Sequence, residues 1–512
     1  MNLDSRTPVV VGVGQAAERI DDANYRGMSA VEVAAAAARA ALDDCGAHIA
    51  AAAAAIDTVA GVRQFEITGV IKAPLGRSNN YPRSVANRIG ATPTRAILEI
   101  VGGQGPQHLI SELAAEIAAG RSEAAMIFGS DTTSTLRHFA QASEGLAKPD
   151  FTETVDGDLE DRGQGMENLV SRYTVSHGLT SAPIQYALLE NARRAGTGLG
   201  PTAYRRQMGE LFAPFTKIAA KNPFAAAPVE RTVDELITVT ERNRMISEPY
   251  PRLMVARDQV NQGAAALLMS VEAARRLGVP EENWVYLHGH ADMEEQSLLT
   301  RPDLGHSPAA VMAVREALAM AGIGIDDIAT FDLYSCFPVP VFNICDGMGL
   351  ATDDPRGLTM TGGLPFFGGA GNNYSMHAVA ETVARMRSAP GQFGLVSANG
   401  GILSKHSVGI YSSTPAEWKP DRSARLQAQV AGWPTEPVTE NADGDATIET
   451  YTVRRDGGQP LGIIIGRLVA DDSRFLATTE DDELTALLIE GEPLGRKVRV
   501  QSFDYGNRCA LR

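Results

Sequence analysis

Short apolar runs alternate along the chain with longer segments in which apolar residues recur every three or four positions. Residues 7–15, "TPVVVGVGQ", have the pattern of a buried strand, and residues 28–44 have that of an alanine-rich amphipathic helix. In the second half, residues 283–291 and 407–413 predict strands, and residues 307–321 predict a helix. This alternation predicts βαβ units and mostly parallel or mixed sheets with helices on both faces.

The chain contains an internal repeat. The segment "VGGQGPQHLISELAAEIAAG" from Val101 is matched by "FGGAGNNYSMHAVAETVARM" from Phe367. The small residues correspond, with Gly102, Gly103, Gly105, Ala114 and Ala118 opposite Gly368, Gly369, Gly371, Ala380 and Ala384. Each copy predicts a glycine turn, a helix and then a strand. Two copies of one α/β unit explain this pattern, and each helix start offers N–H groups and a positive dipole end to a ligand.

Changes in composition along the chain predict four parts. We expect a first α/β half at residues 1–133 plus 256–275, interrupted by an inserted loop domain at 134–255. A second half follows at 276–416, and short β-rich runs at 425–512 predict an additional small β-barrel. The barrel is expected to be an accessory or interaction domain.

Composition excludes several classes of protein. Of 512 residues, 46 are Lys or Arg and 62 are Asp or Glu, so the formal charge of −16 argues against a nucleic-acid-binding protein. The four cysteines are scattered, so neither a disulfide framework nor a metal site is predicted. Without a signal peptide or a membrane-spanning run, a cytoplasmic protein is expected. The lone Gly-x-Gly of "GVGQAAE" is too little for a dinucleotide-binding turn.

The order of several motifs resembles that of the thiolase superfamily. These motifs are "TPVVVGVGQ", "AAKNPFAA", "DQVNQGAAALLMS", "GHSPAAVMAVREAL" and "DLYSCF". The closest likeness is to the sterol-carrier-protein-like branch, and within it to the thiolase-like proteins of type 1, which carry an additional C-terminal domain. The resemblance covers residues 7–415 and continues through that domain. It implies an α/β thiolase fold of two duplicated βαβαβ halves in a layered sandwich.

The family resemblance also implies a reaction, the Claisen condensation or thiolytic cleavage of acyl-CoA. Its catalytic groups are a nucleophilic cysteine at a helix N-terminus, a Gly-His-Pro turn, an Asn- or His-bearing loop and a second cysteine. By resemblance, the nucleophile falls on Gly102 or Gly103, and the histidine falls on Gly369. The loop falls on Tyr334, Ser335, Cys336 and Phe337, and the second cysteine falls near Ser397, just before Asn399. The resemblance therefore implies a pocket without the standard reagents and little or no thiolase activity.

Other residues offer replacements for the missing groups. Cys336 or His406 could form a rebuilt site, although a buried inert thiol and hydrogen-bonded structural histidines (His406, His108 and His377) are the simpler interpretation. The amides of Gln104, Asn372, Asn373 and Asn399 could bind a carbonyl oxygen or only satisfy the turns. Lys217 and Lys221, in the insertion, are candidates for binding CoA phosphates.

Three hypotheses follow. The first is a thiolase-like protein that binds acyl-CoA or a related lipid ligand, with coenzyme A thioester as ligand and no other cofactor. The second is an active acyltransferase or thioesterase with a rebuilt site. The third is a protein that binds a partner through its C-terminal domain. By resemblance, either a homodimer or a monomer is expected.

Overall fold

The first half of the chain forms one mixed sheet. In the computed structural model, which describes residues 3–68, 73–141, 147–167, 169–455 and 458–512, its strands lie in the order β1-β8-β4-β2-β3-β5. Their bounds are β1 (Pro8–Ala17), β2 (Thr58–Gly61), β3 (Arg95–Leu98), β4 (Ala124–Asp131), β5 (Glu160–Asp161) and β8 (Gln262–Ser270). Strand β8 runs antiparallel to both β1 and β4, whereas β4, β2, β3 and β5 are parallel.

The second half repeats this arrangement. Strands β10 (Ile328–Leu333), β11 (Phe393–Gly400), β12 (Lys405–Ser412) and β9 (Tyr286–Glu294) lie side by side in that order. The β10–β11 pair is parallel, and the β11–β12 and β12–β9 pairs are antiparallel. Order and directions match those of β2, β4, β8 and β1, so the predicted α/β fold of two duplicated halves is confirmed.

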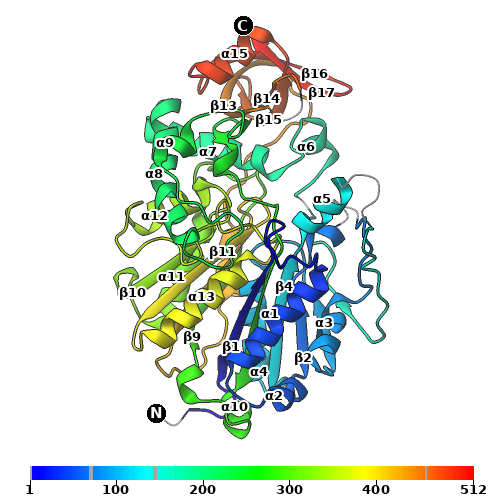
Figure 1. The fold of residues 1–512 in the computed structure, drawn as a ribbon. Helices are drawn as coiled ribbons and strands as arrows, with labels where there is room; N and C mark the ends of the chain where they lie inside the picture. Colours follow the sequence, from blue (N-terminus) through cyan, green and yellow to red (C-terminus); the bar gives the residue numbers. More distant parts are fainter. Residues whose placement is uncertain (1–2, 69–72, 142–146, 168, 456–457) are drawn as a thin grey trace.

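Helices and sheets form a layered sandwich (Figure 1). The two repeat helices, α4 (Gly105–Ala118) and α13 (Tyr374–Ser388), lie between the sheets in one apolar cluster. The first sheet is covered outside by α1 (Ala30–Asp44) and α3 (Tyr81–Ile89), and the second by α11 (Pro308–Ala321) and α12 (Pro338–Met348). Short helices α2 (Ile49–Ala55) and α10 (Val271–Arg276) complete the first half. Among the described residues, no helix is both long and apolar enough to span a bilayer.

Glycines in the edge strands allow the outer helices to pack closely. A methyl group at Gly14 of β1 would overlap the backbone carbonyl of Ala37 in α1, and a methyl group at Gly12 would overlap that of Ala41. At the equivalent place in the repeat, a methyl group at Gly289 of β9 would overlap the carbonyl of Ala317 in α11. The glycines of "GVGQ" therefore serve helix–sheet packing, which agrees with the rejection of a nucleotide-binding turn.

The inserted segment contributes strands to sheets outside itself. It contains α5 (Thr133–Gln141), α6 (Arg172–Ser176), α7 (Ala182–Thr197), α8 (Pro201–Ala219), α9 (Val233–Ile237), β6 (Met245–Ser247) and β7 (Tyr250–Pro251). Strand β5 extends the first sheet, whereas β6 pairs with a strand of the C-terminal region. The buried Glu190 of α7 accepts hydrogen bonds from the hydroxyls of Tyr204 (2.5 Å) and Tyr250 (2.7 Å) and from the N–H of Val339 in α12 (2.8 Å). This carboxyl group joins the insertion to the second half.

The C-terminal region is a closed five-stranded barrel, as predicted. It comprises β13 (Gly444–Arg454), β14 (Leu461–Leu468), β15 (Arg474–Thr479), β16 (Lys497–Phe503) and β17 (Gly506–Leu511). The strands pair in the order β13-β14-β15-β17-β16, and β16 pairs with β13 to close the ring. Helix α14 (Ser423–Val430) precedes the barrel, and α15 (Asp482–Glu490) lies between β15 and β16.

The barrel is held to the rest of the protein by an apolar face and a buried polar network. Ile463 and Leu476 of the barrel belong to the same core cluster as Tyr173 and Leu179 of the insertion. The Tyr173 hydroxyl accepts a hydrogen bond from the N–H of Leu476 (2.7 Å) and from Nδ2 of Asn507 (3.3 Å). A buried polar group that loses its partner costs free energy, so this network fixes the position of the barrel.

Replacing Tyr173 by phenylalanine should loosen the barrel. The change leaves the Leu476 N–H without its acceptor and should cost about 1–2 kcal/mol of local stability. Hydrogen exchange should show faster exchange at Leu476 and Asn507 in the Tyr173→Phe variant. The control is Tyr505→Phe, because the Tyr505 side chain is 60% exposed and its hydroxyl bonds no other described residue. Equal protection in both variants would contradict this role for Tyr173.

Candidate functional site

The first glycine turn leads from β3 into α4 and is joined to the second repeat. The N–H of Gly102 donates to Oδ1 of Asn372 (3.0 Å), and Oγ of Ser375 donates to the carbonyl of Gly103 (2.7 Å). Neither the N–H of Gly103 nor that of Gln104 bonds another described residue. The turn therefore presents two N–H donors at the positive end of α4.

Three of the predicted loops converge at this turn. A methyl group at Gly103 would overlap the hydroxyl of Tyr334 and would lie 2.7 Å from the carbonyl oxygen of Asn399. At Gly102 or Gly400, a methyl group would overlap the carboxamide of Gln104. The structure thus brings the turn, the 334–337 loop and the Asn399 turn into contact, and no side chain fits at position 103 while Tyr334 is in place.

Little space remains between these groups. A cavity of about 20 Å³ is lined by Ala310, Tyr334, Pro340, Ile344, Ser397, Ala398, Asn399, Leu403, His406 and Val408. This volume holds one water molecule. The hydroxyl of Tyr186, a residue that the sequence analysis missed, donates to Oδ1 of Asn399 (2.9 Å) and fixes the amide. Oε1 of Gln104 is buried and has no hydrogen-bond partner among the described residues.

Cys336 and His406 are both held in their neutral forms. Cys336 is buried, and burial raises the pKa of its thiol to about 12. His406 is also buried, and burial together with the charge of Arg301 lowers the pKa of its imidazole to about 3. Its Nε2 lies 3.1 Å from the carbonyl oxygen of Leu403 and 3.2 Å from Oγ of Ser307. Neither a thiolate nor an imidazolium is therefore favoured at neutral pH.

Most of the other predicted residues are engaged in hydrogen bonds or ion pairs within the protein. Two of them lie in the loops: Oγ of Ser335 accepts from the N–H of Leu364 (3.4 Å), and the N–H of Gly369 donates to the carbonyl of Arg257 (2.8 Å). The amides of Asn372 and Asn373 donate through Nδ2 to the carbonyls of Arg63 and Gly129, each at 2.7 Å. Nδ1 of His377 donates to Oε1 of Gln15 (2.7 Å). Lys217 lies 3.8 Å from Glu230, with both side chains 61% exposed, and Lys221 is exposed. Among the described residues, no hydrogen bond or ion pair joins either lysine side chain to the glycine turns.

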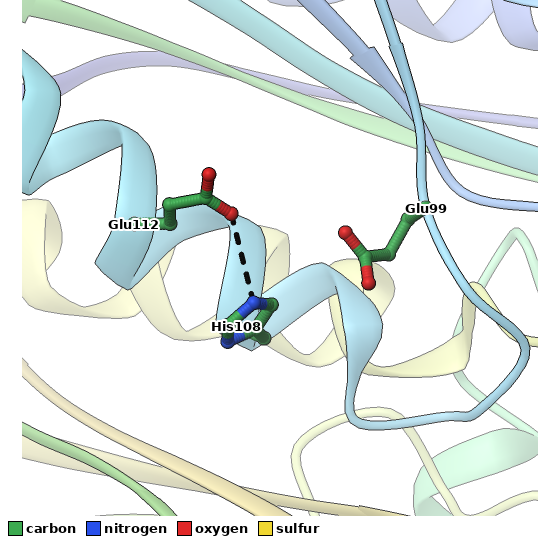
Figure 2. A group of neighbouring side chains, drawn as sticks. All are labelled: Glu99, His108 and Glu112. Carbon is green, nitrogen blue, oxygen red and sulfur yellow. Dashed lines mark ion pairs between the residues drawn. The ribbon is translucent and has the colours of Figure 1, made fainter. Parts of the chain in front are cut away.

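One group of side chains has the donor atoms of a metal site. Glu99 lies before α4, and His108 and Glu112 lie on that helix with their ligand atoms within 4.8 Å of one another (Figure 2). However, the guanidinium of Arg162 bonds both Glu99 (2.7 Å) and Glu112 (2.6 Å). Burial opposes a charge on His108, but Asp292 and these carboxylates outweigh it and raise its pKa to about 9. Arg162 therefore already supplies the positive charge that a metal would bring.

A buried carboxyl pair near the second glycine turn was missed by the sequence analysis. Asp131 ends β4 beneath Gly371, and its Oδ2 accepts from the N–H of Phe65 (3.2 Å). Burial and then the charge of Glu66 raise the pKa of Asp131 to about 8, and burial raises that of Glu66 to about 7. In the sequence, Asp131 follows an ordinary apolar strand, so nothing there distinguishes it from a surface aspartate.

Comparisons with known structures place this architecture in a class of proteins. The dimeric peroxisomal thiolase of Saccharomyces cerevisiae is 13% identical with a TM-score of 0.55, covering 80% of this chain and 98% of that one. An Ltp2-ChsH2(DUF35) aldolase is 18% identical with a TM-score of 0.57, again covering 80% and 98%. These likenesses show that about 80% of this chain shares the fold of those structures. A comparison with curated protein sequences finds no match.

Two further findings define the family. Residues 425–504 match the family model of the thiolase-like protein type 1 additional C-terminal domain. A monomeric SCP2-thiolase-like protein type 1 from Mycobacterium smegmatis is 58% identical over 100% of both chains, with a TM-score of 0.86. The chain therefore belongs to the SCP2-thiolase-like proteins of type 1, as the motifs predicted.

The titration of Asp131 should be visible in stability. Its folded-state pKa of about 8 lies above the unfolded value of roughly 4, so its contribution is fully present below about pH 4 and is lost as pH rises through about 8. In Asp131→Asn that loss is absent. Relative to wild type, the variant should gain stability between about pH 5 and pH 8.5, by an amount on the order of a few kcal/mol.

Thermal unfolding at the two pH values measures this effect. Asp353→Asn, on an exposed loop, is the control and should shift the unfolding temperature equally at both pH values. If the difference in unfolding temperature between Asp131→Asn and wild type were also the same at both pH values, Asp131 would not be a buried acid that binds a proton near neutral pH.

Proposed function

We propose that this thiolase-like protein binds an acyl-CoA or related acyl ligand at the converging turns and does not catalyse the thiolase reaction. The observation that carries the proposal is the contact between Gly103 and the Tyr334 hydroxyl. Thiolysis through an acyl-enzyme needs a nucleophile at the start of α4, and Gly102 and Gly103 have none. A cysteine side chain at position 103 would overlap Tyr334.

Several features support ligand binding at the same place. The N–H groups of Gly103 and Gln104 are donors for a carbonyl oxygen, and Gln104 Oε1 is a buried acceptor in need of a donor. Tyr334 fills the space that an acyl group would take. Its hydroxyl bonds no other described residue, so rotation of the ring would break no hydrogen bond. We therefore propose that the ligand enters by displacing the Tyr334 side chain.

A rebuilt catalytic site is the weaker interpretation. It would use Cys336 as nucleophile or His406 as base, but burial favours the neutral thiol and the neutral, low-pKa imidazole. Protonated thiols are poor nucleophiles, and an imidazole with a pKa of about 3 is a weak base.

A partner-binding role for the barrel is also less favoured. The outer face of β14 and β15 packs on the insertion, where Ile463 and Leu476 are buried, and the Tyr173 hydroxyl bonds the backbone of β15. This face of the barrel is therefore already used inside the chain. We propose that the barrel chiefly stabilises the insertion above the turns.

Thiolysis and binding measured on one sample test the proposed function. The wild-type protein should cleave acetoacetyl-CoA no faster than the background. Tyr334→Ala should bind acetyl-CoA at least about tenfold more tightly by calorimetry, a gain of ~1.4 kcal/mol, because removing the ring opens space for the acyl group. Tyr334→Phe is the matched control, since it keeps the ring and should bind like wild type.

Two results would overturn the proposal. Wild-type turnover that disappears in Cys336→Ala would establish a rebuilt enzyme. The absence of acetyl-CoA binding in both wild type and Tyr334→Ala would show that no acyl site exists at these turns.

We further propose that the protein is a monomer, because the open edge of the first sheet is covered. Strand β5 pairs with β3, placing Glu160 beside Ile97 and Asp161 beside Leu98. The ion pair between Arg95 and Glu160 (2.8 Å) adds charge to this edge. A covered, charged sheet edge disfavours strand pairing with a second copy of the protein. Light scattering should give a mass near the 54.4 kDa of one chain, and a mass near twice that value would contradict the proposal.

A further inference from the structure

Arg257 lies where the insertion returns to the first half, against two of the converging loops. Its N–H donates to the carbonyl of Leu364 (3.1 Å), and its carbonyl accepts from the N–H of Gly369 (2.8 Å). The preceding residue, Ala256, donates its N–H to the carbonyl of Cys336 (3.0 Å). These backbone bonds fix Arg257 beside both the Gly369 turn and the 334–337 loop.

The guanidinium of Arg257 forms no ion pair with any residue that the structure describes. It is half-buried, and its Nε donates to the carbonyl of Gln259 (3.2 Å), whereas its Nη atoms bond no other described residue. Burial, and then the charges of Arg252 and Arg137, lower the pKa of Arg257. The nearby Asp258 opposes this only in part, because its carboxylate is paired with Arg137 at 2.6 Å.

Arg252 extends the same positive surface. Its backbone N–H donates to the carbonyl of Arg244 (2.9 Å), and its Nη1 donates to the carbonyl of Arg242 (3.3 Å). The exposed side chain forms no ion pair with a described residue. Among the described residues neither arginine forms an ion pair, and the charge of Arg252 acts unfavourably on the partly desolvated Arg257. A bound anion would relieve this repulsion.

We propose that Arg257 and Arg252 bind the phosphate groups of a nucleotide-bearing ligand at the mouth of the converging turns. Guanidinium groups fit phosphate oxygens in a bidentate manner, and the unbonded Nη atoms of Arg257 supply such a fork. The phosphates come either from the nucleotide part of an acyl-CoA, in which case the inference rests on the proposed function, or from a free nucleotide. The arginines take the role that the sequence analysis gave to Lys217 and Lys221, of which Lys217 already pairs with Glu230.

Calorimetry on the full chain tests this site with four probes: acetyl-CoA, 3′,5′-ADP, inorganic pyrophosphate and acetyl-pantetheine, which lacks the nucleotide. Arg257→Gln and Arg252→Gln should each weaken binding of the three phosphate-bearing probes about tenfold or more, and should leave acetyl-pantetheine binding unchanged. The control is Arg385→Gln on the last turn of α13, which removes one exposed charge that forms no ion pair with a described residue, and it should change nothing.

The unfolding temperature gives a second readout that does not depend on the acyl site. Without anion, Arg257→Gln should unfold at or above the wild-type temperature, because a repelled charge is removed. Pyrophosphate should raise the unfolding temperature of wild type and Arg385→Gln but not that of Arg257→Gln.

The outcomes separate the two proposals. Suppose that phosphate binding depends on the arginines but acetyl-CoA binds no more tightly than 3′,5′-ADP. This result would support the anion site and overturn the acyl site. Acetyl-CoA binding that survives in both arginine variants, or that is lost in Lys221→Gln instead, would overturn the anion site alone. If no phosphate-bearing probe bound the wild-type chain, the anion site would be wrong.

Discussion

The structure depends on the joining of two repeat helices at their first turns. Helices α4 and α13 lie between the sheets, and the Gly102–Asn372 and Ser375–Gly103 hydrogen bonds connect their N-terminal segments. Because the helices share one core, the ends of the parallel strands of both halves face the same region. The candidate site lies there, and residues about 270 positions apart in sequence meet in it.

Within this region, the side chains are closely packed. The Tyr334 ring and the Gln104 carboxamide occupy the space above the glycines, so the turn is compact and the cavity holds one water molecule. The same burial that closes the site keeps Cys336 and His406 neutral. The guanidinium of Arg257, which forms no ion pair with a described residue, belongs instead to a residue held beside the Gly369 turn. This distribution fits recognition of a ligand better than covalent chemistry.

The additional barrel and the insertion are joined by strand pairing and hydrogen bonds. Strand β13 pairs with β6, and Tyr173 bonds the backbone of β15. The insertion is therefore held from above by the barrel and from below by Glu190 against α12. Such support on both sides limits how the segment around Arg257 moves, because that segment follows β7, which pairs with β6, and β6 in turn pairs with β13 of the barrel.

The sequence by itself determined the duplicated α/β architecture, the barrel and the identity of the turns that converge. These follow from hydrophobic periodicity, from glycine spacing and from the order of family motifs, all of which are local in the chain. Only the tertiary structure decided that Tyr334 covers Gly103, that Tyr186 fixes Asn399 and that Asp131 and Arg257 carry unusual charge environments. Those properties arise from burial and from distances between residues remote in sequence, which no local pattern contains.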